Sequence, residues 1–505
     1  MKTKTALHQL RKTAKGFAGH GGGRWGNVPQ PPDWYTTSVQ LCGIYPFGTG
    51  SARPTDGAPL GRDMIADTAI CTDPEALYRA GVISSPSMMV FGINGVGKSS
   101  TVQTMALGMV GRGMTLASFD PMKGEHTALT DALGGTVLQV GPNGSRLNIL
   151  APGPLGLAAE IIGGEIGEEL AALARHKAVQ QTQLMARISR GKSLSDIEDT
   201  VLAAVVATAQ AASRRPVTAD LLKVFDAPSE LVLSESRQTT APRFHKRFAE
   251  LGETLSSMLA GEMGQLLGGA DAIEFDPGNP GGFCFDTSGI SQSNTRLLSA
   301  AMLGTWSLGM DAIDAHWELA QHEARLAAET PGYEPKVHWG GYVTLMDEFW
   351  FPMRNCPGIV DLADALSRTN RGKGVTEIKI THSPKDFLSL PNKADRETAR
   401  GFAERSGVLG LMSLTEEDLR ELSKVKKLTE EEIALVASFN ASQSWGGRRK
   451  RRRAVPGHST GKATPPPGAG KILLKVEGRV GIPIQMLQTS IQEQVHIADQ
   501  RFRTQ

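Results

Sequence analysis

Short apolar runs alternate with stretches of helical periodicity in the first part of the chain. The run 88–91 ends at a glycine-rich loop, and beyond it apolar residues recur at helical spacing from Val102 to Val110. A short apolar run bounded by glycine is typical of a buried strand, whereas spacing by three and four predicts a helix. The alternation continues with a strand at 115–119, a helix at 126–133 and a strand at 136–140. This order predicts a parallel sheet with crossover helices, an α/β fold.

Strand signals disappear between residues 153 and 225, where Ala, Glu, Leu and Gln dominate. Ser195 and Glu198 form a capping box ahead of an apolar periodic segment, so this region predicts an all-helical insert. Later strands are predicted at 282–286, 342–346 and 375–381, a long amphipathic helix around 311–327, and helix starts at Thr415 and Thr429. The sheet therefore resumes after the insert.

We divide the chain into six predicted parts on these signals and on composition. A flexible basic arm rich in Gly and Pro precedes the core, and an Arg/Pro/Gly-rich linker follows it. The parts are the arm at 1–38, the first part of the core at 39–150, the insert at 151–240, the second part of the core at 241–440, the linker at 441–471 and a C-terminal segment at 472–505.

Composition limits the classes of protein that fit. With 505 residues, of which 40% are hydrophobic, the chain can form several domains with a sizeable core. No stretch approaches the roughly 18 apolar residues of a membrane-spanning helix, and the first thirty residues lack the apolar centre of a secretory signal. Four scattered cysteines, without metal-ligand spacing, fit reduced thiols. We expect a cytoplasmic protein.

Positive charge is concentrated in one place. The formal net charge is +2, and the basic run Arg448–Arg453 alone supplies +6, so the rest of the chain carries −4. Such a run either binds a polyanion such as DNA or an anionic lipid, or is simply solvated within the linker.

The glycine-rich loop carries the strongest chemical signal. Residues 92–99 read GINGVGKS, a full match to G-x-x-x-x-G-K-[ST], with a strand before it and a helix after it. Glycines let the main chain approach a triphosphate, Lys98 reaches the β and γ phosphates, and Ser99 binds Mg²⁺. The predicted ATP-binding residues are Gly92, Ile93, Asn94, Gly95, Val96, Gly97, Lys98, Ser99 and Ser100.

An acidic pair follows a later apolar strand. Asp347 and Glu348 come directly after the run 343–346. Alone, the pair is equally compatible with a solvated strand end. Beside a phosphate-binding loop it predicts Asp347 as a Mg²⁺ ligand through water, and Glu348 as the base that orients the attacking water.

Three further residues are candidates for a role in catalysis. Hydrolysis needs positive charge at the γ phosphate, often from a neighbouring subunit, and Arg368 and Arg371 lie between the acidic pair and the next strand. Each is otherwise an ordinary surface arginine. His382 stands at the end of that strand, where it is either a γ-phosphate sensor or a satisfied core histidine.

In these motifs the chain resembles the ATPases of type IV secretion and conjugation systems, in their actinobacterial form, within the FtsK-HerA group of motors. The resemblance rests on YPFGTG, GAPLGRD, GINGVGKSS, FDPMKGEHTALTDALGGTVLQVGP, LMDEFW, ALSRTNRGKG, ITHSPKDF and KVEGRVGIPIQM in this order. It implies a RecA-like core with a helical insert, a homohexameric ring with ATP between neighbours, and an arginine, Arg368 or Arg371, that acts on a neighbour's nucleotide. The family usually has Gln where this chain has His382.

The resemblance also implies a motor that energises assembly of, or substrate transfer through, a secretion channel, at the inner face of the membrane beside its inner-membrane components. Two alternatives remain at this point. One is a DNA-translocating coupling ATPase, which would normally carry its own transmembrane helices. The other is a scaffold that binds nucleotide without hydrolysis, against which Glu348 argues because binding alone needs no base.

Overall fold

A computed structural model describes most of the chain. The described residues are 11–13, 16–18, 53–120, 122–213, 215–269, 273, 275–355, 360, 370–388, 390, 393–439 and 468–495. Arg368, the basic run Arg448–Arg453 and the predicted start of order near residue 39 lie outside them, as does most of the predicted arm and linker. The chain divides into a unit of residues 1–52 and a unit of residues 53–505. In the first unit, β1 (Arg11–Thr13) and β2 (Gly16–Ala18) pair antiparallel.

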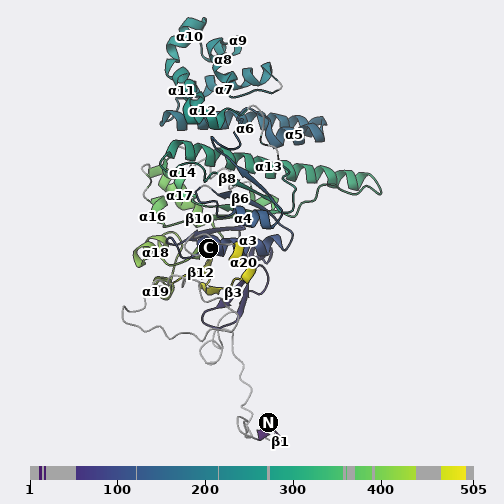
Figure 1. Ribbon diagram of the computed structural model, residues 1–505, viewed down its shortest axis with the longest axis vertical. Coiled ribbons are helices and arrows are strands. Elements are labelled where there is room, and N and C mark those ends of the chain that lie inside the picture. The colour runs from purple at the N-terminus through teal and green to yellow at the C-terminus, as the bar shows by residue number, and fades with distance from the viewer. Residues whose placement is uncertain are drawn as a thin grey trace, which may run out of the picture. The chain divides into compact units, whose positions relative to one another are not determined.

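One sheet organises the second unit (Figure 1). Its eleven strands stand in the order β4-β3-β13-β12-β11-β5-β10-β9-β6-β8-β7. The strands from β11 to β7 are parallel to one another, and β12, β13, β3 and β4 continue the sheet with antiparallel pairing. The strands are β3 (Pro59–Asp63), β4 (Ala69–Cys71), β5 (Ser87–Phe91), β6 (Thr115–Asp120), β7 (Thr136–Gln139), β8 (Phe283–Asp286), β9 (Tyr342–Met346), β10 (Val375–Thr381), β11 (Val408–Leu411), β12 (Lys471–Val476) and β13 (Ile482–Met486).

Both faces of the parallel part are covered, which explains why its strands are continuously apolar. Successive side chains of β5 point to opposite faces. Met88 and Val90 join a core with helix α3 (Lys98–Val110), whereas Met89 and Phe91 join the core beneath helix α13 (Thr295–Glu329). The helices of the sheet region are α2 (Pro74–Arg79), α3 (Lys98–Val110), α4 (Thr127–Ala132), α13 (Thr295–Glu329), α14 (Trp350–Asn355), α16 (Lys385–Leu388), α17 (Lys393–Arg405), α18 (Glu416–Ser423), α19 (Glu430–Ser438) and α20 (Ser490–Val495), with a 3₁₀ turn η1 (Asn370–Lys373).

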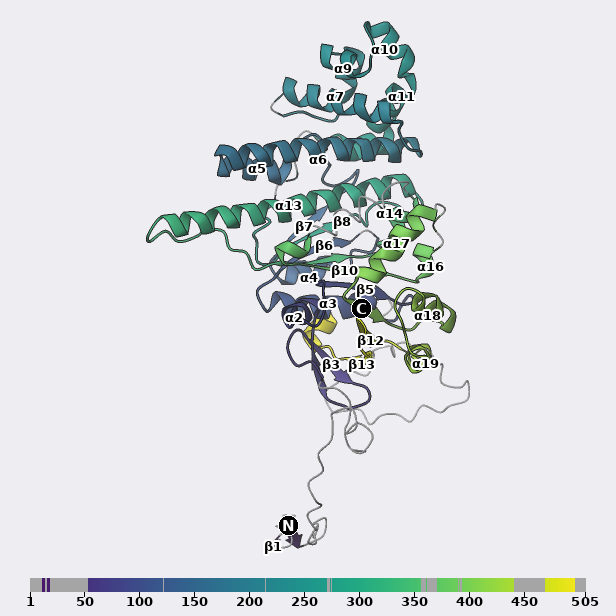
Figure 2. The same ribbon diagram turned by 180° about the vertical axis from the view of Figure 1, so that it is seen from behind.

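The predicted insert is helical. Its helices run on beyond residue 240 as far as Leu267: α5 (Gly153–Ile162), α6 (Gly164–Arg190), α7 (Asp196–Ala212), α8 (Asp220–Asp226), α9 (Glu230–Glu235), α10 (Ala241–Arg247), α11 (Ala249–Leu259) and α12 (Gly261–Leu267). The capping box of Ser195 and Glu198 opens α7 as expected. Figure 2 shows α6 lying along α13, which in turn lies along the sheet.

Helix α13 is longer than the sequence pattern predicted. The expected helix at 311–327 is its second half, and the first half begins at Thr295. Leu297, Leu298, Ala300, Ala301 and Leu303 are all buried there, since this half is enclosed between the sheet and the insert. A helix that is apolar on several sides gives no single-faced periodicity, so the pattern did not reveal it.

No helix among the described residues is long and apolar enough to cross a membrane. Cys71 and Cys284 are free thiols, as expected, and the other two cysteines lie outside the described residues.

A buried carboxylate adds a polar contact between α19 and the hairpin of β12 and β13, which is already paired within the sheet. Glu432 on α19 accepts hydrogen bonds from Lys475 Nζ at 2.9 and 3.0 Å and from the Gly481 amide at 2.6 Å. Its other contact completes the capping box with Thr429. Glu432 and Lys475 are each only 4% exposed.

We expect Glu432→Ala to lower the free energy of unfolding by about 3–5 kcal/mol, because it leaves the Lys475 ammonium buried without a counter-charge. Urea unfolding of the full chain measures this. Glu430→Ala is the matched control, because Glu430 lies on the same helix and forms an exposed ion pair with Arg420, and we expect it to cost less than about 1 kcal/mol. An equal loss in both variants would contradict the assignment.

Candidate functional site

The loop 92–97 lies between the ends of β5 and α3 and is fixed by its neighbours in the sheet. The Gly92 amide donates to the carbonyl of His382 at 3.1 Å. A Cβ on Gly92 would stand 2.9 Å from Cβ of Met412, so only glycine fits there. Gly95 and Gly97 have φ of 81° and 89°, the left-handed region that glycine tolerates. The main chain therefore wraps around the amino end of α3, an arrangement that suits phosphate.

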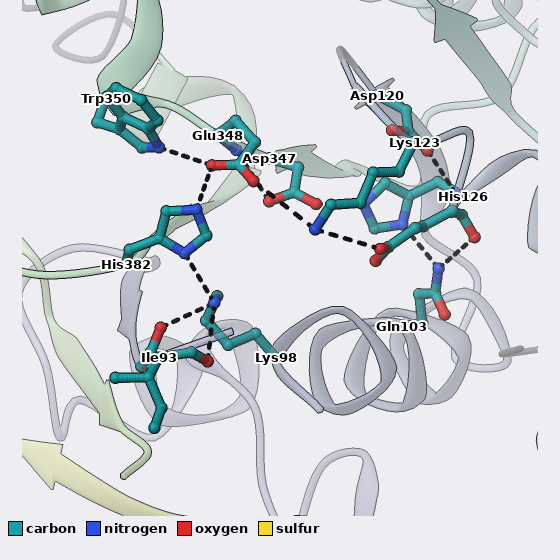
Figure 3. Close-up of polar contacts among 12 residues, drawn as sticks. Ile93, Lys98, Gln103, Asp120, Lys123, His126, Asp347, Glu348, Trp350 and His382 are labelled. Carbon is teal, nitrogen blue, oxygen red and sulfur yellow. Dashed lines mark hydrogen bonds and ion pairs between the residues drawn. The ribbon is translucent and has the colours of Figure 1, made fainter. Parts of the chain in front are cut away.

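Lys98 begins α3, and its ammonium group turns back over the loop (Figure 3). Nζ donates to the carbonyl oxygens of Gly92 at 2.7 Å and Ile93 at 3.2 Å. A third contact, of 3.0 Å, joins Nζ to Nδ1 of His382. Burial lowers the pKa of Lys98, and the charges of Asp347 and Glu348 oppose this effect in part.

His382 joins the lysine to the acidic pair. Its Nδ1 faces Lys98, and its Nε2 lies 2.9 Å from Oε2 of Glu348. Since an ammonium group only donates, Nδ1 must accept, and Nε2 carries the proton that is donated to Glu348. The neutral imidazole with hydrogen on Nε2 satisfies both contacts, whereas the doubly protonated ring loses the bond from Lys98.

Glu348 is held in a strained and well-defined position. Its φ of 49° is in the left-handed region, which is unusual for a residue with a side chain. Besides His382, the indole nitrogen of Trp350 donates to Oε2 at 2.6 Å, and Lys123 Nζ lies 3.9 Å from Oε1. Burial opposes ionisation of Glu348, but the hydrogen bonds from His382 and Trp350 and the charge of Lys123 outweigh it and lower the pKa.

Asp347 is buried beside a second histidine. Its Oδ1 accepts the Glu348 amide at 2.8 Å, and its Oδ2 lies 3.8 Å from Nε2 of His126. The amide of Gln103 donates to Nδ1 of His126, so Nε2 carries a hydrogen, and this buried nitrogen has no hydrogen-bond partner. Burial raises the pKa of Asp347 to about 6, against the lowering effect of His126. The carboxylate thus lacks the donors that an isolated buried charge needs.

The segment after β6 supplies residues that the sequence analysis did not assign. Lys123 reaches toward Glu125 and Glu348, and the charges of these carboxylates and of Asp347 raise its pKa despite burial. Asp120 accepts the His126 amide at 2.6 Å and so fixes the start of α4. The motif FDPMKGEH contains these residues, but only the pairing of β6 with β9 brings it to the acidic pair.

The structure thus brings Lys98, His382, Glu348 and Asp347 together at one edge of the sheet, beside the amino end of α3 with Ser99 and Ser100. Arg371 lies elsewhere, in η1 before the amino end of β10. The seven residues of β10 place that turn roughly 20 Å from the loop edge, at about 3.3 Å per residue. Arg371 therefore does not belong to the site on its own chain.

Groups of this kind suit phosphoryl transfer. A glycine-lined main chain and an ammonium group attract phosphate oxygens, a buried carboxylate with a single backbone donor suits a divalent cation, and a fixed, ionised carboxylate suits a water molecule.

Three solved structures align with most of this chain. VirB4 of Thermoanaerobacter pseudethanolicus aligns with a TM-score of 0.61 over 88% of this chain and 100% of its own, at 17% identity. The bacterial conjugative coupling protein TrwB, unbound, aligns over 86% of this chain and 90% of its own with a TM-score of 0.46 and 12% identity. The plasmid coupling protein TrwB in complex with ADP and Mg²⁺ aligns over 93% and 98% with the same score and identity.

The likeness to VirB4 shows the fold and confirms the predicted class, an α/β core with a mostly parallel sheet and a helical insert. No protein-family model matches the chain, and no curated protein matches it in sequence.

We expect Asp347→Asn to raise the free energy of unfolding at pH 8 by about 1–3 kcal/mol. The folded-state pKa of about 6 lies above the ordinary value of 3.8 for an aspartate. Ionisation therefore destabilises the fold fully above pH 6, and the penalty disappears as pH falls toward 4. Chemical unfolding of both proteins at pH 8 and pH 5 measures the difference, which should shrink at the lower pH. A gain that is equal at both values would contradict the assignment.

Proposed function

We propose that this chain is an ATPase that energises assembly of, or substrate transfer through, a type IV secretion or conjugation channel. The observation that carries the ATPase is the continuous chain of contacts from Lys98 through His382 to Glu348, next to Asp347. A scaffold that only binds nucleotide has no need of a fixed, ionised carboxylate at this place. The role in a secretion channel is supported by the fold of VirB4 and by the order of motifs in the sequence.

The binding part of the site fits ATP with Mg²⁺. The left-handed Gly95 and Gly97 turn the loop around the triphosphate, and Lys98 would exchange the loop carbonyls for phosphate oxygens. Ser99 and Asp347 would hold the metal, Asp347 through water, and binding of a cation would lower the raised pKa of that carboxyl. Mg²⁺ supplies charge compensation for the transferring phosphoryl group.

Glu348 is the residue that acts on water. Its lowered pKa keeps it ionised at neutral pH, and the donors Trp350 and His382 fix the direction of its carboxylate. His382 would sense the nucleotide, because the ammonium group of Lys98, which donates to its Nδ1, would turn toward the phosphate oxygens when ATP binds. Binding of ATP thus alters the hydrogen bonding of the imidazole that orients the base.

Hydrolysis also needs an arginine at the γ phosphate, and in this proposal a neighbouring subunit supplies it. Arg371 stands at the opposite edge of the sheet from its own loop. In a closed ring, here a homohexamer, that edge of one subunit faces the loop edge of the next, so the arginine acts in trans. Arg368, three residues earlier in the sequence, is the alternative donor. We further propose that the ring works at the inner face of the cell membrane with inner-membrane components of the channel.

Glu348→Gln should lower kcat for ATP hydrolysis by about 10²–10⁴-fold, because the amide neither accepts a proton nor polarises water. Nucleotide affinity should stay within about threefold of the unmodified chain, since the site keeps its binding groups. Lys98→Ala should weaken binding by about 10–100-fold and also abolish hydrolysis. Steady-state hydrolysis with titration of a fluorescent ATP analogue measures both quantities. Unchanged turnover in Glu348→Gln would refute the assignment of the base.

Arg371→Ala should lower kcat by about 10³-fold with little change in ATP binding. Mixing it with an equal amount of Glu348→Gln should restore roughly a quarter of the unmodified rate, since a quarter of the interfaces then join an intact site to an intact arginine. No restoration in mixed assemblies would argue against action in trans by Arg371.

A further inference from the structure

A chain of partly buried ion pairs joins the helical insert to the turn that carries Arg371. Lys177 of α6 donates to Asp311 and, at 3.0 Å, to Asp314, both on α13. The other oxygen of Asp314 accepts from Lys373, the last residue of η1. Two cations and two carboxylates thus balance across three elements that are far apart in sequence.

These charges are well shielded from water. The side chains of Lys177, Asp311, Asp314 and Lys373 are 17%, 14%, 21% and 24% exposed. An ion pair this buried gains little net stability over apolar residues of similar volume, because desolvation cancels much of the attraction. The ion pair instead fixes the relative positions of the two side chains, since displacing one of them leaves the charge of the other uncompensated.

Packing alone does not join these elements. A pocket at the junction of α6 and α13 is lined by Pro152, Gly153, Lys177, Gln181, Leu308 and Asp311. Lys177 and Asp311 therefore meet beside a space rather than within a close-packed core. Polar contacts therefore add to the apolar packing of α6 against α13 at this place.

The turn is tied down at its last residue by two contacts. Besides the ion pair of its ammonium group, the carbonyl of Lys373 accepts from the indole nitrogen of Trp339 at 2.9 Å. Arg371 precedes this anchored residue by two positions. A displacement of Lys373 therefore also displaces the main chain at Arg371.

We propose that Lys373, held by Asp314 and through it by Lys177, is a positioning residue that sets the place of Arg371 at the subunit edge and couples it to the helical insert. This inference rests on the proposed function. It couples the insert to hydrolysis. A displacement of α6 would pass through α13 to η1 and so change the position of Arg371 at the neighbour's site.

Lys373→Met removes the charge and keeps the length of the side chain. We expect kcat to fall by about 10–100-fold, as for a catalytic group displaced by about 1 Å, with KM for ATP nearly unchanged. Lys373→Arg should restore most of the rate. Asp314→Asn, which preserves shape, should reproduce the loss, and Lys177→Met should show it to a smaller extent. Arg187→Met is the control, because Arg187 pairs with Asp199 inside the insert at similar burial and should leave kcat unchanged.

Mixed assemblies distinguish positioning from general damage. Mixing Lys373→Met with Glu348→Gln should raise the rate above the sum of the two separate rates, because the Glu348→Gln subunits supply a well-placed Arg371. A general loss of folding would lower the unfolding temperature and would not be rescued by mixing, and that result overturns the inference. A kcat of Lys373→Met equal to that of the unmodified chain also overturns the inference. If the unmodified chain itself fails to hydrolyse ATP, the proposed function fails instead.

Discussion

Three adjacent parallel strands determine the site. β10 lies between β5 and β9, with Thr381 opposite Phe91 and Lys379 opposite Met346. Because the three strands run in the same direction, the loop after β5, His382 after β10 and the acidic pair after β9 must meet at one edge of the sheet. The order of these strands puts the imidazole between the ammonium group and the carboxylate. Every contact described for nucleotide chemistry depends on this register.

Several energetically unfavourable residues of the fold lie at this same edge of the sheet. Glu348 adopts a left-handed backbone conformation, Asp347 is buried with too few donors, and Lys98 is desolvated at the start of α3. Such features persist only where the surroundings are rigid. Part of that rigidity comes from Gly470, directly before β12, which donates its amide to the carbonyl of Val96 in the loop. The main chain at the start of the C-terminal hairpin thus supports the phosphate-binding loop directly.

The sequence predicts those parts of the fold and of the site that depend on local sequence pattern. The loop motif, the strand ends at Asp120 and Asp347, and the helix starts at Thr415 and Thr429 all depend on neighbours in the chain, and the structure has them as expected. Strand order is not a local property. Without it, nothing indicated that Lys123 and His126 would face the acidic pair, or that β12 and β13 would lie between β11 and β3. Arg371 could be proposed to act in trans, but its distance from its own loop follows only from the direction of β10.

β10 also explains how one subunit could link two nucleotide sites under the proposed function. Its seven residues are all buried, and each pairs with β5, with β9 or, at 377–379, with both, so the strand has little freedom to bend. His382 follows its carboxyl end and η1, with Arg371, precedes its amino end. A rigid strand transmits a shift rather than absorbing it. A change at His382 on binding of ATP would then reach Arg371 at the far edge, where the ion pair of Lys373 with Asp314 of α13 would oppose it. In the proposed ring, the balance between these two anchors would set how strongly successive subunits are coupled.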